Sequence, residues 1–150
     1  MHHARILLSD TDLRGPEKRV VAILRAWQHG PDAQADIWDD LCRSMGDPRA
    51  RACLQAFEQM QSLLDRHGWQ ALTILSPETK GISSDEASVA RFVMSATEQD
   101  RDTALAEAGF LVSPAALLPL LCAASRFGLP LLCEDCRERV RAAVRQAPSQ

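Results

Sequence analysis

Apolar residues recur at intervals of three and four along most of the chain, which is the spacing of one helix face. The first such stripe lies in residues 16–29, between a proline at the start and Gly30 at the end. Its apolar members are Val20, Ile23, Leu24 and Trp27. Proline in the first turn and glycine after the last turn are typical helix boundaries. The same reasoning predicts helices over residues 31–45 and 48–67.

The middle of the chain continues this pattern after one irregular stretch. Ser83 and Glu86 have the spacing of a capping box, in which each side chain accepts a backbone N–H of the other residue. A helix is therefore predicted to start there. The polar run at residues 98–102 predicts a break before a further helix that ends near Leu111. Asp100 would otherwise fall on the apolar stripe of one continuous helix.

Two copies of Leu-Pro-Leu-Leu-Cys, at residues 118–122 and 129–133, dominate the C-terminal third. Each copy is assigned to its own helix, and the second helix ends near Arg145. Gly128 and Pro130 are expected to separate the two, because proline removes a helix hydrogen bond and clashes with the preceding turn. The whole pattern predicts an all-α, single-domain bundle of about seven short helices.

A few segments fall outside this helical pattern. Residues 69–75 contain Thr and Ile and could form a short extended segment, either packed on the core or paired across a dimer. Residues 76–82 are predicted to form a loop between a three-helix N-terminal half and a C-terminal helical half. Residues 1–14 are expected to be an arm or a loosely packed segment, and residues 147–150 a disordered tail.

Composition narrows the range of partners. The chain has 150 residues, of which 46% are hydrophobic, and a net charge of −3, whereas nucleic-acid-binding domains are usually basic. No uninterrupted apolar stretch reaches the roughly 18 residues of a membrane span, and the apolar run at residues 6–8 is too short for a signal peptide. Five cysteines without the spacing of a secreted scaffold favour reduced thiols and a cytoplasmic location. The excess of Arg over Lys is typical of GC-rich bacterial genomes.

The cysteines are the first candidates for chemistry. All of them occupy positions in apolar helical stripes, and free Cys is among the most buried residue types, so they are interpreted as core residues. They are Cys42, Cys53, Cys122, Cys133 and Cys136. The alternative is a thiol-based metal or redox site formed by Cys133-x-x-Cys136 with Cys122. A structural zinc site needs four ligands and this set supplies three, so no metal and no cofactor is predicted.

Two further patterns have more than one interpretation. The acidic residues of the second predicted helix could bind a divalent cation, but they are better interpreted as a solvated face; they are Asp32, Asp36, Asp39 and Asp40. The first three helices and residues 69–75 could also form a winged-helix DNA-binding domain, with Arg49 and Arg51 facing DNA. The net negative charge and the acidic second helix argue against that interpretation.

The remaining expectation is protein–protein contact. The sequence contains no nucleophile elbow, Walker loop, dinucleotide-binding glycine pattern or His-Glu-x-x-His, which favours a non-enzymatic regulatory or adaptor domain. Apolar residues beyond the predicted core are expected to contact an unknown protein partner or a second copy of the chain; they are Phe110, Leu111, Leu117 and Leu120. A cationic face of the last helix could contribute to the same surface, through Arg137, Arg141 and Arg145.

Overall fold

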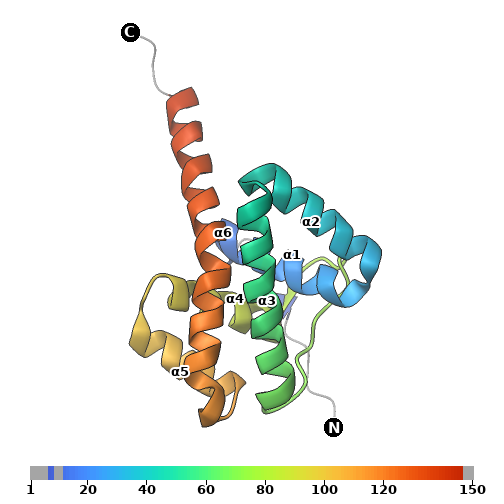
Figure 1. Cartoon of the computed structure of the whole chain (residues 1–150), viewed down its shortest axis with the longest axis vertical. Coiled ribbons are helices and arrows are strands. Elements are labelled where there is room, and N and C mark those ends of the chain that lie inside the picture. Colours follow the sequence, from blue (N-terminus) through green and yellow to red (C-terminus); the bar gives the residue numbers. More distant parts are fainter. Residues whose placement is uncertain (1–6, 9–11, 147–150) are drawn as a thin grey trace.

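A computed structural model of the chain describes residues 7–8 and 12–146 (Figure 1). Within these residues the fold is an all-α bundle with one short pair of strands, which confirms the predicted fold class. The helices are α1 (Gly15–His29), α2 (Pro31–Met45), α3 (Asp47–His67), α4 (Ser84–Thr97), α5 (Arg101–Leu111) and α6 (Leu117–Gln146). The predicted tail at residues 147–150 and most of the predicted arm at residues 1–14 lie outside the described residues.

The first three helices follow one another through single glycines. Gly30 and Gly46 have φ angles of +122° and +85°, which residues with a Cβ rarely adopt. A proline stands in the first turn of each of the three helices, where a missing N–H leaves no hydrogen bond unmade. The helix boundaries predicted from the glycine and proline positions are therefore confirmed for α1, α2 and α3.

The predicted capping box and the predicted break are both present in the next two helices. The Ser83 hydroxyl accepts the backbone N–H of Glu86 at 3.1 Å, and the Glu86 carboxylate accepts the N–H of Ser83 at 3.0 Å. Helix α4 ends at Thr97 with Gln99 at φ +61°, a left-handed conformation that lets the Asp100 N–H reach the Ser95 carbonyl at 3.0 Å. This reversal separates α4 from α5.

The segment between α3 and α4 packs on the core without forming a strand at residues 69–75. Leu72 and Ile74 are partly buried against the core, and the Trp69 indole N–H donates to the Gly109 carbonyl at 2.9 Å. The described pair of strands is elsewhere, between β1 (Leu7–Leu8) and β2 (Ile82–Ser83), which run antiparallel. Just before residues 69–75, Gly68 and Val112 form an isolated antiparallel bridge. Residues 69–75 thus take the first of the two roles considered for them, a connection packed on the core.

Helix α6 is one continuous helix, so the predicted separation at Gly128 and Pro130 is wrong, and the number of α-helices in the described residues is six rather than seven. Packing explains the continuity. Phe127 and Leu131, on either side of the expected break, are both fully buried on the same face. A Cβ on Gly128 would collide with Thr97 Oγ1 and Val93 Cγ1, so glycine is what allows α6 to approach α4 closely. Gly128, which by sequence would be expected to end a helix, is here the residue at which α6 packs closely on α4.

Helix α6 is also the centre of the bundle, where it packs mainly against α3 and α4 (Figure 1). The aromatic side chains of the core meet beside it: the ring of Phe57 lies 5.1 Å from that of Phe127 and 5.4 Å from that of Trp27. Helices from both halves contribute to this one hydrophobic cluster. The C-terminal part of α6 then extends past the other helices, as the orange and red end of the ribbon in Figure 1 shows.

Candidate functional site

The apolar residues expected to form a contact surface divide between core and solvent. Phe110 is 84% exposed, as expected. Leu111 and Leu120 are buried, and Leu117 is partly buried against the core, so these three do not form the expected exposed surface. These three residues lie on the core faces of α5 and α6. In a leucine-rich sequence the spacing of apolar residues does not show whether a helix face is buried in the core or exposed to solvent.

Three of the five cysteines also differ from expectation. Cys53 is buried and Cys42 is partly buried against the core, in agreement with the core interpretation. Cys122, Cys133 and Cys136 are exposed. They do belong to an apolar stripe of α6, but the stripe faces away from the bundle. Helical periodicity identifies which residues share a face, yet it does not say which face meets the core.

Helix α6 therefore has two apolar faces. Its core face consists of residues that are all buried, namely Leu120, Ala123, Ala124, Phe127, Gly128 and Leu131. The opposite face has a second series at helical spacing, and all of its members are exposed. We call this series the outer stripe; it consists of Leu118, Cys122, Leu129, Cys133, Cys136, Val140 and Val144. The sequence pattern predicted that the three cysteines of this stripe are core residues, whereas all three are exposed.

The outer stripe concentrates the exposed apolar side chains of the protein. Six large hydrophobic residues are exposed in the part of the chain whose burial is described, and four of them lie on this stripe. They are Leu118, Leu129, Val140 and Val144, with exposed fractions of 62, 54, 63 and 70%. Single exposed apolar residues are common, but a row on one helix face is typical of a surface that another molecule covers.

The end of α6 is a cationic arm, which we define as residues 137–146. It contains four arginines and one glutamate, for a net charge of +3. Of the predicted cationic residues, Arg141 pairs with Glu138 at 2.8 Å and Arg137 lies 3.7 Å from Glu134. Helical geometry places Arg145 on the side away from the outer stripe and Arg141 at the edge of the stripe, next to Val144. The arm is therefore amphipathic, and Val140, Ala143 and Val144 form its apolar side.

The three candidate thiols do not come together within one chain. Cys133 and Cys136 are one helical turn apart, whereas Cys122 lies eleven residues before Cys133, about 16 Å away along the axis. Such a separation is several times a zinc–sulfur bond of about 2.3 Å. Among the described residues no group of three His, Cys, Asp or Glu side chains could hold a metal ion. One chain thus supplies two adjacent thiols.

A buried ion pair is the most constrained polar feature of the fold. Arg25 Nε and Nη2 donate to the two carboxylate oxygens of Glu86 at 2.7 and 2.9 Å. The same guanidinium donates to the carbonyls of Thr79 and Gly81, and Glu86 also accepts the N–H of Leu75 at 3.1 Å. Burial alone would raise the pKa of Glu86, but these hydrogen bonds and the Arg25 charge together outweigh it and lower that pKa.

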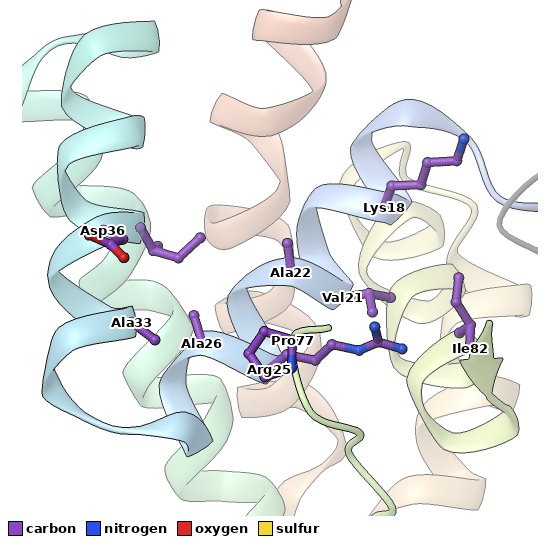
Figure 2. A pocket seen from close by; sticks show the side chains of 10 residues that line it. Lys18, Val21, Ala22, Arg25, Ala26, Ala33, Asp36, Pro77 and Ile82 are labelled. Carbon is purple, nitrogen blue, oxygen red and sulfur yellow. The ribbon is translucent and has the colours of Figure 1, made fainter. Parts of the chain in front are cut away.

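This pair joins α1, the segment at residues 75–81 and α4. Arg25 also lines a hollow of about 340 Å³. Figure 2 shows the Arg25 side chain extending from α1 towards Ile82, with Lys18 and Asp36 at opposite sides. The walls are otherwise small and apolar. Since the Arg25 guanidinium already donates to Glu86 and to two carbonyls, we interpret the network as structural. The sequence identified Glu86 only as a capping residue, and nothing marked Arg25 as its partner.

The other two patterns remain solvent-facing. The acidic side chains of α2, at positions 32, 36, 39 and 40, are all exposed, and Asp40 is 3.4 Å from Arg19. Arg49 and Arg51 are exposed in the first turns of α3. A winged-helix arrangement would need residues 69–75 as a strand, and these residues form none. The fold therefore lacks that wing.

The two apolar faces explain one further property of α6. Within the described residues, the helical stretch Pro114–Gln146 is long and apolar enough, by length and composition, to cross a membrane, with a mean hydropathy of 1.7 over its most apolar window. Of that window, 39% is buried inside the bundle. The core face thus supplies part of the hydropathy and the outer stripe much of the rest.

Comparison of the chain with protein-family models, curated proteins and solved structures finds no significant match. Functional inference therefore depends on the residues and their geometry.

Proposed function

We propose that this protein is a non-enzymatic protein–protein interaction domain whose binding element is the outer stripe of α6. The observation that carries the proposal is the concentration of exposed apolar side chains on one face of one helix. Burying such side chains against a partner contributes about 25 cal/mol per Å² of apolar area removed from water. The cationic arm adds charged groups at the edge of the same surface.

The outer stripe has no evident role in stabilising the bundle. The core face of α6 already packs against α3 and α4 through fully buried residues such as Phe127 and Leu131. Leu129 and Val140 lie on the other side of the helix and are more than half exposed. A polar residue at either position would keep the fold and increase solubility. Their apolar character is therefore best explained by contact with another molecule.

The proposal can be tested by photo-cross-linking in the source cells. A photoreactive phenylalanine analogue replaces Val140 on the outer stripe, and the control variant carries it at Glu138, which is exposed on the opposite face of the arm. We expect discrete protein adducts at position 140 after irradiation, and far weaker ones at position 138. Equal adducts at both positions, or none at position 140, would contradict the proposal.

A further inference from the structure

We propose that the partner of the outer stripe is a second copy of this chain, paired with it through α6 in antiparallel orientation. This inference rests on the proposed function and names the partner. In this arrangement Cys133 of one chain lies opposite the partner's Cys136, and Leu129 lies opposite the partner's Val140.

The spacing of the outer stripe identifies a helix as its partner. From Leu129 to Ala143 the apolar positions advance by four, three, four and three residues. This is the heptad pattern by which two helices pack side chains of one into spaces of the other. The members are Leu129, Cys133, Cys136, Val140 and Ala143, all exposed. In the described chain, the helix with this exposed pattern is α6, so a second copy supplies a matching surface.

The arm also gains little stability from the bundle. It forms the last ten residues of the 30-residue α6, about 15 Å of helix. All residues of the arm are exposed except Ala142, which is partly buried, so the bundle gives it little packing. An antiparallel second copy lays each arm along the outer stripe of the partner's bundle and so provides the missing contact.

Charge selects the antiparallel orientation over the parallel one. Each arm carries +3, so a parallel pair would hold two cationic arms side by side. With Cys133 opposite the partner's Cys136, the centres of the two arms are about 21 Å apart along the axis, about two and a half times the Debye length of about 8 Å at physiological salt. In this register the partner's arm lies along residues 123–132 of α6, whose one charged residue is Arg126, so each arm faces a single cation instead of a second arm of charge +3.

In this register the C-terminal end of the partner's α6 lies near two arginines of the first chain. The partner's Ala143 lies opposite Arg126, which occupies a heptad position on the exposed side of α6. Beside it is a groove of about 740 Å³ between α4, α5 and α6, with Leu118 and Leu121 among its apolar walls and Arg101 among its polar ones. The last carbonyls of a helix carry partial negative charge, which arginines stabilise. Arg126 and Arg101 are therefore placed to receive the partner's helix end.

Cysteine cross-linking tests both the pairing and its direction. Cys42 and Cys122 are first replaced by serine, and Cys53 is left in place because it is buried. Cys136→Ser then leaves Cys133 as the exposed thiol, and Cys133→Ser leaves Cys136. Diamide oxidises two thiols to a disulfide and takes up their two hydrogens. Each variant is treated alone and as an equimolar mixture, and circular dichroism checks that the helical content is unchanged.

We expect the covalent dimer to form in the mixture and to be largely absent, at the same reaction time, from either variant alone. Adding Val140→Glu to both variants should abolish it. Equal cross-linking of each variant by itself would overturn the antiparallel pairing, and absence of a covalent dimer from every sample would overturn the second copy as partner. In the latter case adducts with another protein at position 140 would leave the proposed function standing, whereas loss of those adducts as well would refute both.

Discussion

Replacing Gly128 by alanine tests the central packing of the fold, the contact between α6 and α4. Two opposing effects act on this substitution. Alanine is better than glycine in a helix by about 1 kcal/mol. At position 128, however, the new methyl group would collide with Thr97 Oγ1 and Val93 Cγ1, both buried, and overpacking of this kind costs about 1–3 kcal/mol. We expect Gly128→Ala to lower the free energy of unfolding by about 1 kcal/mol net.

The chain offers a matched control in Gly109 of α5. A Cβ at this position would meet no atom within 4 Å, and the residue is exposed. Gly109→Ala therefore keeps the helix-propensity gain without the collision, and should raise the free energy of unfolding by about 0.5–1 kcal/mol. The measurement is urea denaturation of both variants and the wild type, with unchanged m-values as the check that the same surface unfolds. If Gly128→Ala stabilised the protein as much as Gly109→Ala does, the close approach of α6 to α4 at this point would be wrong.

Three other predictions concern single groups. Glu86→Gln should cost about 3–5 kcal/mol of unfolding free energy in urea denaturation, because it removes the carboxylate charge that faces Arg25 at a buried site. Asp135→Asn, in a more exposed pair of the same 2.7 Å length, should cost less than about 1 kcal/mol. Equal costs would refute the burial argument. Burial raises the pKa of Cys53 to about 12 from 9.0, so the thiol of the unfolded chain ionises first as the pH rises. Between pH 7 and 10 the wild type should therefore lose about 1.4 kcal/mol of unfolding free energy relative to Cys53→Ala. Parallel pH profiles of unfolding free energy for the two proteins would contradict this. Gln99→Gly should stabilise the protein by about 0.5–1 kcal/mol, measured as a rise in Tm, because it relieves the left-handed conformation at φ +61°; a fall in Tm would argue against that backbone.

The helix boundaries could be predicted well where a local chemical signal marks them. Proline in the first turn and a glycine at positive φ act within a few residues, so the limits of α1, α2 and α3 follow from sequence alone. The capping box at Ser83 is equally local. At Gly128 and Pro130 the same local signals predict a break, but burial of Phe127 and Leu131 on α3 and α4 keeps the helix continuous. Tertiary packing outweighs the local preference there.

The candidate surface was harder to predict, for a related reason. Periodicity grouped Leu129, Cys133, Cys136 and Val140 with Leu132 on one face. The first four are exposed together, whereas Leu132 packs partly against the core. Which of the two apolar faces of α6 meets the bundle depends on α3 and α4, far away in the sequence, and so does the burial of Leu111 and Leu120. The pairing of Arg25 with Glu86 joins residues 61 positions apart, and no local pattern marks it.

Sedimentation equilibrium of the purified, reduced protein tests the pairing through α6 most directly. Val140→Glu places a charge on the outer stripe, and Arg145→Glu places one on the opposite face of the arm as a control. Both sites are exposed, so neither change should alter the free energy of unfolding of one chain by more than about 0.5 kcal/mol. We predict a reversible species of two-chain mass for the wild type and Arg145→Glu, and one-chain mass for Val140→Glu. One-chain mass for all three proteins, or two-chain mass that survives Val140→Glu, would contradict the account.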